Sequence, residues 1–116
     1  MTIVYNSKTE SQKNMLYREM KDRMYIKSIS ESEVATIGRG TDIIYFMPGC
    51  EGASEICKQH KILSIAAVAK PVKSGNVSVA IALENEKPRV FVSLSSLRAE
   101  DHSLSMDILR IADVSK

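Results

Sequence analysis

The sequence of 116 residues lacks several features that would point directly to a function. It has no tryptophan and only two cysteines and two histidines. No apolar run approaches the ~18 residues that a membrane-spanning helix requires. The first eight residues, MTIVYNSK, have neither the basic start nor the long apolar core of a secretory signal. A membrane span and a signal peptide are therefore not expected within these residues.

Clustered charge is also missing. The net charge is +2, and the lysines and arginines are scattered along the chain. A nucleic-acid-binding domain would gather them on one face, so this class is not expected. With 44% hydrophobic and 26% charged residues, the composition is that of an ordinary soluble globular protein. The length predicts a single domain over residues 1–116 with a small core.

Catalytic signatures are absent as well. There is no G-x-S-x-G nucleophile elbow. The stretch GRGT follows no predicted strand and lacks the lysine of a phosphate-binding loop, so we interpret it as a turn. A receiver domain needs carboxylates after its first and third strands, where this chain has Asn6 and Met47. We therefore expect a protein that is not an enzyme and needs no cofactor.

What the sequence does contain is an alternation of strand and helix patterns. Short β-branched or aromatic runs alternate with segments of helical spacing. Strands are expected at Thr2–Tyr5, Tyr25–Ser30, Asp42–Met47 and Ile62–Val68, with helices at Lys8–Arg23, Glu31–Gly38 and Glu51–Lys61. Such alternation predicts a parallel sheet with helices on both faces, a three-layer Rossmann-like arrangement.

Two capping boxes support the first two helices. Ser7 precedes Glu10, and Ser30 precedes Glu33, by the spacing at which a serine hydroxyl and a carboxylate satisfy backbone donors reciprocally. The strand DIIYFM is continuously apolar, which is typical of a strand that is buried on both faces of a sheet. A methionine stripe in the first helix, at Met15, Met20 and Met24, is interpreted as core packing.

The pattern changes after the fourth strand. Pro71 and Gly75 predict a loop too short to cross the sheet, so the next strand is not expected to pair in parallel with the fourth. Val77–Leu94 alternates apolar and other residues on either side of the turn ENEKP, which predicts an antiparallel hairpin. The expected fold is a mixed sheet of about four parallel strands plus this C-terminal hairpin. The remaining tail is expected to form one or two short helices, with a strand at Ile108–Ile111 as the alternative.

In a sheet of this kind a small ligand binds beyond the carboxyl ends of the parallel strands. Residues with suitable polar or turn-forming character follow the first, third and fourth predicted strands. We take Asn6, Ser7, Gly49, Cys50 and Lys70 as the candidate ligand-binding residues.

The cysteines allow sharper hypotheses that we set aside. Cys50 could be a nucleophile at a helix amino terminus, but only His60 and His102 could serve as its base. Cys57 and His60 have the spacing of metal ligands, yet zinc needs three or four protein ligands, so no metal site is expected. Within one helix the two cysteines would lie roughly 10 Å apart, too far for a disulfide, so they could pair only if Cys50 lies outside the helix and the chain folds back. We expect two buried or half-buried free thiols.

The hairpin offers a second candidate surface. An uncovered edge strand presents unpaired backbone groups to which a partner strand can add. We take Lys87, Arg89 and Phe91 as candidate contact residues for a protein partner.

The carboxyl-terminal third resembles the YfiR-like family of bacterial periplasmic proteins. The matching pieces are Gly75 and the stretches VAIALEN, KPRVFVSL, SSLRAE and LSMDILRIA. The chain departs from the family pattern at Ser93, where Asn is usual, at Asp101, where Gly is common, and at Met106, where Ser is usual. The aromatic-rich helix that precedes this region in the family has no counterpart here.

The resemblance implies a non-enzymatic regulatory domain. Members of the family restrain a membrane-bound diguanylate cyclase from the periplasm, which lowers cyclic-di-GMP signalling and biofilm formation, and they act as dimers. The expected partner is thus a membrane-bound signalling enzyme, with a homodimer as a further expectation. The alternative is a small-molecule sensor or ligand-binding domain with its site at the strand ends. The expected location is the periplasm, or the cytoplasm if Met1 is the native start.

Overall fold

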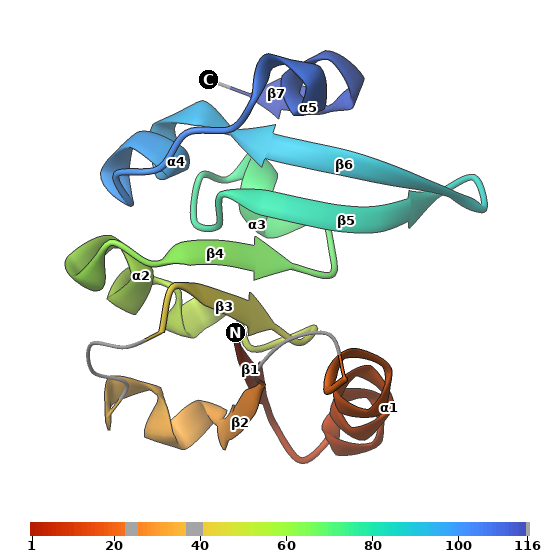
Figure 1. Cartoon of the computed structure of the whole chain (residues 1–116), viewed down its shortest axis with the longest axis vertical. Coiled ribbons are helices and arrows are strands. Elements are labelled where there is room, and N and C mark those ends of the chain that lie inside the picture. The colour runs from red at the N-terminus through yellow and green to blue at the C-terminus, as the bar shows by residue number, and fades with distance from the viewer. Residues whose placement is uncertain (23–25, 37–40, 116) are drawn as a thin grey trace.

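One mixed sheet forms the centre of the protein (Figure 1). The structure is a computed structural model that describes residues 1–22, 26–36 and 41–115. Its strands are β1 (Thr2–Tyr5), β2 (Lys27–Ser30), β3 (Ile43–Phe46), β4 (Leu63–Ala66), β5 (Val79–Glu84), β6 (Lys87–Ser93) and β7 (Asp113–Ser115). Their order is β2-β1-β3-β4-β5-β6-β7, and only β5 and β6 pair antiparallel. The predicted α/β class and the antiparallel hairpin are confirmed.

The helices connect these strands and are shorter than the sequence suggests. They are α1 (Glu10–Met20), η1 (Glu31–Thr36), η2 (Glu51–Ala53), α2 (Glu55–His60), α3 (Lys70–Lys73), α4 (Leu94–Ala99) and α5 (Met106–Ile111), where η marks a 3-10 helix. The single helix predicted for residues 51–61 is divided in two at Ser54. The alternative of a strand at Ile108–Ile111 is wrong, because these residues lie in α5.

The start of α1 differs from the predicted capping box. Ser7 is exposed, and the carboxamide oxygen of Asn6 accepts hydrogen bonds from the Lys8 and Thr9 backbone N–H groups at 3.0 and 3.1 Å. Asn6 N–H in turn donates to Thr9 Oγ1 at 3.0 Å. An asparagine turn thus leads into the helix, since asparagine bonds its own following backbone more readily than serine does. The prediction that Ser7 caps this helix is wrong.

Other predicted details fall partly outside the described residues. Arg23, Met24 and Tyr25 do so, as does the predicted turn at residues 38–40. The described part of the next helix, η1, is a 3-10 helix, and the hydroxyl of Ser30 before it bonds that of Ser32 at 3.0 Å. In α1, Met20 is half-buried but Met15 is 66% exposed, so the predicted burial of a methionine stripe is wrong for Met15.

The connection between β4 and β5 contradicts the expectation of an antiparallel neighbour. Residues Lys70–Lys73 form the single turn α3, with Pro71 near its first position, where the missing N–H costs nothing. β5 then pairs with β4 in parallel through Ile65–Val79 and Ala66–Ala80. The crossover is possible because the twelve residues 67–78 connect β4 to β5, about the length that a parallel connection requires, although only four of them are helical. The hairpin therefore begins with the fifth parallel strand.

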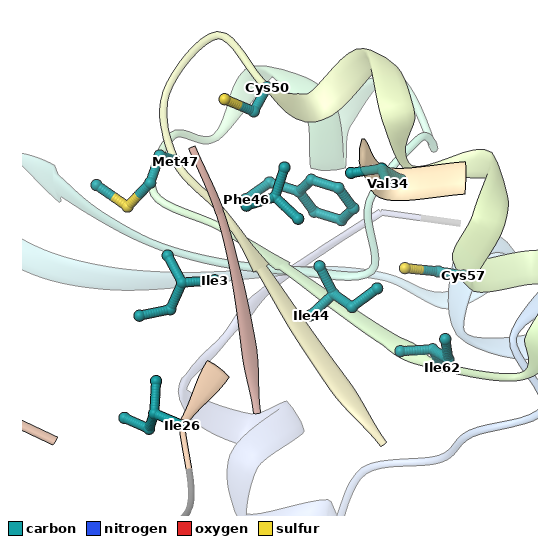
Figure 2. Close-up of a cluster of buried hydrophobic side chains, with 10 residues drawn as sticks. Ile3, Ile26, Val34, Ile44, Phe46, Met47, Cys50, Cys57 and Ile62 are labelled. Carbon is teal, nitrogen blue, oxygen red and sulfur yellow. The ribbon is translucent and has the colours of Figure 1, made fainter. Parts of the chain in front are cut away.

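The two faces of the sheet are buried to different extents. The covered face carries fully buried side chains from successive strands, including Val4, Ile44, Phe46 and Ala66. Figure 2 shows Ile44 and Phe46 on this side of β1 and β3, with Ile3 on the other side. We call the second side the open face, because its residues on β3 and β4 are only half-buried. The prediction that β3 is buried on both faces is therefore wrong within the described residues.

The hairpin turn between β5 and β6 consists of Asn85 and Glu86. Both have positive φ angles, 52° and 66°, as a type I′ turn requires. This turn matches the twist of the flanking strands, but the second position strongly favours glycine. A glutamate there holds a strained backbone.

We expect the substitution Glu86→Gly to stabilise the fold by about 0.5–1 kcal/mol, because glycine adopts positive φ without steric cost. Urea unfolding at neutral pH measures the effect. The matched control is Glu55→Gly in α2, where helical φ makes the same exchange destabilising by about 1 kcal/mol. Equal effects of the two exchanges would contradict the assignment of strain to this turn.

A buried carboxylate fastens α4 to the covered face. Glu100 is 0% exposed and follows α4 directly. Its Oε1 accepts from the Ser64 N–H at 3.0 Å and from Ser78 Oγ at 2.5 Å, and its Oε2 accepts from Ser64 Oγ at 2.6 Å. Lys58 Nζ lies 4.0 Å from Oε2. These groups gather at the amino ends of β4 and β5, opposite the strand ends that are candidates for ligand binding.

Candidate functional site

The carboxyl ends of β1 and β3 form the topological switch point of the sheet. From β1 the chain passes to β2 on one side, and from β3 it continues to β4 on the other. The loops that follow β1 and β3 therefore diverge at their carboxyl ends. In open α/β sheets this divergence creates the crevice in which ligands bind.

Asn6 and Gly49 come together in this crevice from different strands. The Asn6 carboxamide oxygen is used within its own turn, so its Nδ2 group points elsewhere. A Cβ built on Gly49 would lie 3.5 Å from Asn6 Nδ2. Gly49 also has a φ of +90°, a conformation that residues with a Cβ rarely adopt. The sequence analysis predicts that both residues follow parallel strands at the same edge of the sheet, and the structure places them there.

Glu51 was not a candidate from sequence, but it belongs to the same crevice. Its Oε2 accepts a hydrogen bond from the Gly49 N–H at 3.0 Å. Its Oε1 is buried and has no hydrogen-bond partner. A buried carboxylate oxygen without a partner is rare, because desolvation costs free energy that no bond repays. In the sequence, the only sign of this role is that Glu51 stands two residues after the turn glycine Gly49. The same pattern is found where an acidic residue begins a helix in solvent.

Cys50 lies in the loop after β3 as part of the buried core, and it is 0% exposed (Figure 2). Burial, and to a lesser extent the nearby Glu31 and Glu51, raise the pKa of its thiol to about 11, against the lowering effect of a hydrogen bond with Thr9. The thiol is therefore protonated and enclosed at neutral pH. Nucleophilic chemistry needs the thiolate and access to it, and Cys50 has neither.

The remaining predicted ligand-binding residues are less closely placed. Ser7 is exposed in the turn after β1, and Lys70 is exposed at the start of α3 after β4. Both lie on loops at the carboxyl ends of parallel strands, as predicted. No hydrogen bond or ion pair described here joins either residue to Asn6, Gly49 or Glu51.

The predicted protein-contact residues do not form one exposed edge. Phe91 is only 3% exposed and packs with Ala66 and Ala80 on the covered face. β7 pairs with β6 from Phe91 to Ser93, so this part of the hairpin is not an edge. Lys87 and Arg89 are exposed beyond β7, and Arg89 forms an ion pair with Asp113 at 3.6 Å. The prediction is wrong for Phe91 because its side chain packs in the core of the covered face with Val72 of α3.

Cys57 and His60, which have the spacing of metal ligands, do not lie on a common surface. Cys57 is buried, and burial together with the nearby Glu100 raises the pKa of its thiol to about 12, although Lys58 lowers it. His60, three residues on, is exposed. Both cysteines are free, as predicted. In the part of the chain that the structure describes, no helix has the length and apolarity to cross a membrane.

Comparison with known proteins supports the fold and leaves the family open. No family model matches the chain, and no curated protein does. A conserved domain protein from Vibrio cholerae has a similar structure, with a TM-score of 0.82, 13% identity, and coverage of 99% of this chain and 54% of that one. The resemblance to the YfiR-like family therefore stays a prediction.

Two further similar structures are binding proteins. One is the ligand-free, open structure of a substrate-binding protein with adhesive properties from Clostridium difficile, with a TM-score of 0.79, 14% identity, and coverage of 99% of this chain and 53% of that one. The other is an ABC domain in complex with L-Trp from Streptococcus pneumoniae, with a TM-score of 0.70, 12% identity, and coverage of 97% and 53%. The chain thus spans about half the length of the solved structures it matches.

Proposed function

We propose that this chain is a non-enzymatic domain that binds a small polar ligand in the crevice between β1 and β3. The observation that carries the proposal is the unpartnered, buried Oε1 of Glu51 at the topological switch point. A ligand that donates a hydrogen bond, above all an ammonium group, would satisfy this oxygen. Asn6 Nδ2, beside Gly49, supplies a donor for an acceptor on the same ligand.

The similar structures support the class of ligand. One of them is described in complex with L-Trp, which carries an ammonium and a carboxylate. The crevice of this chain offers an acceptor and a donor of the matching kinds. Substrate-binding proteins close two domains around their ligand, and this chain has the extent of half of such a structure. A second domain would then complete the site from the opposite side.

We expect at least one L-amino acid from a complete panel, L-Trp included, to bind and to raise the midpoint of thermal unfolding. Isothermal titration calorimetry then measures the dissociation constant. The substitution Glu51→Gln removes the carboxylate charge and puts an NH₂ group in place of one of the two oxygens. We expect it to weaken binding at least about tenfold, or ~1.4 kcal/mol.

The control is Glu55→Gln, the same exchange on the exposed first turn of α2. It leaves the crevice untouched and should bind as the unmodified protein does. If no amino acid binds, or if both substitutions weaken binding equally, the crevice is not the site.

The regulatory role implied by the YfiR-like resemblance is compatible with this proposal. A periplasmic domain that restrains a membrane cyclase would respond to its ligand through the same crevice. The diguanylate cyclase, cyclic-di-GMP signalling and the periplasmic location follow from the resemblance alone, and they stay predictions.

A further inference from the structure

The hairpin extends beyond the rest of the sheet at the edge where the crevice lies (Figure 1). β4 pairs with only the first two residues of β5, and β7 pairs with Phe91–Ser93 at the end of β6. Among the described residues, those in between pair only with each other. We call Ile81–Glu84, Lys87–Val90 and the turn that joins them the hairpin arm. At about 3.3 Å per residue, the arm continues for ~13 Å past the end of β4.

The backbone of β5 directs hydrogen-bonding groups toward the side of the arm that faces the end of β4. In an antiparallel pair, alternate residues point both N–H and C=O at the partner strand. Ser93 N–H donates to Ser78 O at 2.8 Å, so the even-numbered residues of β5 face β6. Pro88, which has no N–H, accordingly lies opposite the odd-numbered Leu83. The C=O of Ile81 and the N–H of Leu83 therefore point to where β4 would continue.

No strand among the described residues occupies the place beyond the end of β4. After Ala66 the chain turns into α3 on the covered face, and no described hydrogen bond joins residues 67–69 to β5. On the far side of this place lies β3, two strand spacings or about 10 Å from β5. The loop after β3 carries Gly49 and Glu51 of the crevice. The place is therefore one strand wide, between the hairpin arm and the crevice.

We propose that the ligand of the crevice is the amino-terminal end of an extended peptide, whose next residues add to the hairpin arm as a strand that continues the line of β4. The inference rests on the proposed function and names the class of its ligand. One peptide residue would donate its N–H to the Ile81 C=O and accept from the Leu83 N–H, as parallel strands do. A peptide that begins at the sheet and runs outward is parallel to β5, so its amino terminus lies at the crevice.

Glu51 favours the amino terminus of such a peptide over its carboxyl terminus. Its Oε1 is buried and has no hydrogen-bond partner. An ammonium group would supply a donor and the opposite charge, whereas a carboxylate would supply neither. Asn6 Nδ2, beside Gly49, can donate to the carbonyl oxygen of the first residue. At about 3.4 Å per residue, one or two further residues cover the ~5 Å from β3 to the line of β4.

Exposed apolar surface on the arm supports an added strand. A two-stranded hairpin is marginal in water unless packing or a third strand supports it. Ala82 packs on the covered face with Ala66 and Phe91, but Ile81, on the open face, is 54% exposed. The peptide residues on either side of the bridging one would place their side chains beside Ile81. We therefore expect β-branched or other apolar residues at alternate positions of the peptide.

We expect pentapeptides of the form Xaa-Val-Thr-Val-Ser, prepared with each common amino acid as Xaa, to bind in isothermal titration calorimetry. The best of them should bind at least about tenfold more tightly than the corresponding free amino acid, because the added strand makes backbone hydrogen bonds. Acetylating its amino terminus removes the ammonium group and should weaken binding at least about tenfold. The substitution Glu51→Gln should weaken the binding of peptide and free amino acid alike.

Backbone methylation tests the addition of a strand directly. An extended chain directs the N–H groups of alternate residues toward one neighbouring strand. A peptide methylated at its third backbone nitrogen and one methylated at its second and fourth therefore form a matched pair. Only one member of the pair should lose affinity, by at least about tenfold. Equal affinities of the two would show that the peptide does not bind as a strand.

Hydrogen exchange measured by NMR locates the peptide on the arm. Saturating peptide should slow the exchange of the Leu83 N–H at least about tenfold, because a peptide carbonyl then accepts from it. The Ala82 N–H faces β6 in both states, so its exchange should change less than about twofold. Unchanged exchange at Leu83 with the peptide bound would place the peptide elsewhere and overturn the inference.

The free amino acids separate this inference from the proposed function. If a free amino acid binds and no peptide binds more tightly, the crevice takes single amino acids. The peptide inference is then overturned, while the proposed function stands. If neither free amino acids nor peptides bind, both are overturned.

Discussion

Replacing Glu100 by alanine is expected to destabilise the fold by about 4 kcal/mol, a large part of the stability of a domain of this size. Glu100 is fully buried and accepts from the Ser64 N–H and from the hydroxyls of Ser64 and Ser78. Without it these buried donors are left unsatisfied, at about 1–3 kcal/mol each before relaxation. Lys58 also loses the carboxylate 4.0 Å from its Nζ. Urea unfolding followed by circular dichroism measures the loss.

Two further variants separate the hydrogen bonds from the mere removal of a side chain. Glu100→Gln keeps the shape and one carbonyl oxygen, which can still accept from the Ser64 N–H and the Ser78 hydroxyl. Its NH₂ group takes the place of the oxygen that accepts from the Ser64 hydroxyl, and the charge facing Lys58 is lost, so we expect about half the loss. Glu55→Ala removes an exposed glutamate and should change the stability by less than about 0.5 kcal/mol. A loss below 1 kcal/mol for Glu100→Ala would mean that water replaces the carboxylate and that the network is not stabilising.

This network also shows where sequence reasoning stopped. The alternation of strands and helices and the hairpin were predicted correctly, because apolar periodicity reports local structure directly. Glu100 follows a short helix in a polar stretch, RAEDHS, where an acid is normally solvated. Its burial depends on serines 22 and 36 residues away in the chain, and no local pattern encodes that meeting.

The candidate site was predictable to a similar extent. The location of Asn6 and Gly49 was predictable because residues at the carboxyl ends of neighbouring parallel strands meet at one edge of a sheet, and their role in ligand binding stays a prediction. Glu51 was missed, since its unpartnered oxygen is a property of the folded loop. The edge at β6 was misassigned because β7, three residues long, follows a helix and carries only one strongly apolar residue, Val114. Strands of that length carry too little periodicity to be recognised.

The open face is another case in which the local sequence pattern and the tertiary packing differ. The pattern of β3 predicts burial on both sides, and the structure buries one side only. Both statements hold if residues other than those described here cover the second side of β3. A disagreement between pattern and burial therefore points to an interface, just as an unpartnered polar atom points to a ligand.

The second large effect concerns alkaline pH, at which we expect the fold to lose about 4 kcal/mol between pH 8 and 10.5. Burial raises the pKa of Cys50 to about 11 and that of Cys57 to about 12, while both thiols titrate near 9 in the unfolded chain. Above pH 9 the unfolded state therefore binds fewer protons than the folded state, and stability falls by about 1.4 kcal/mol per pH unit for each thiol. Below pH 8 both states hold the protons and the contribution is constant.

Urea unfolding at half-unit intervals of pH, under reducing conditions, measures this slope. In the variant with Cys50→Ala and Cys57→Ala the baseline stability is lower because two buried side chains are shortened, but the part of the slope due to the thiols disappears. The comparison of slopes is thus independent of the packing cost. Identical slopes in the two proteins would show that the thiols ionise in the folded state as easily as in the unfolded chain. The interior around β1 and β3 would then admit water and charge, contrary to the enclosed core on which the crevice is built.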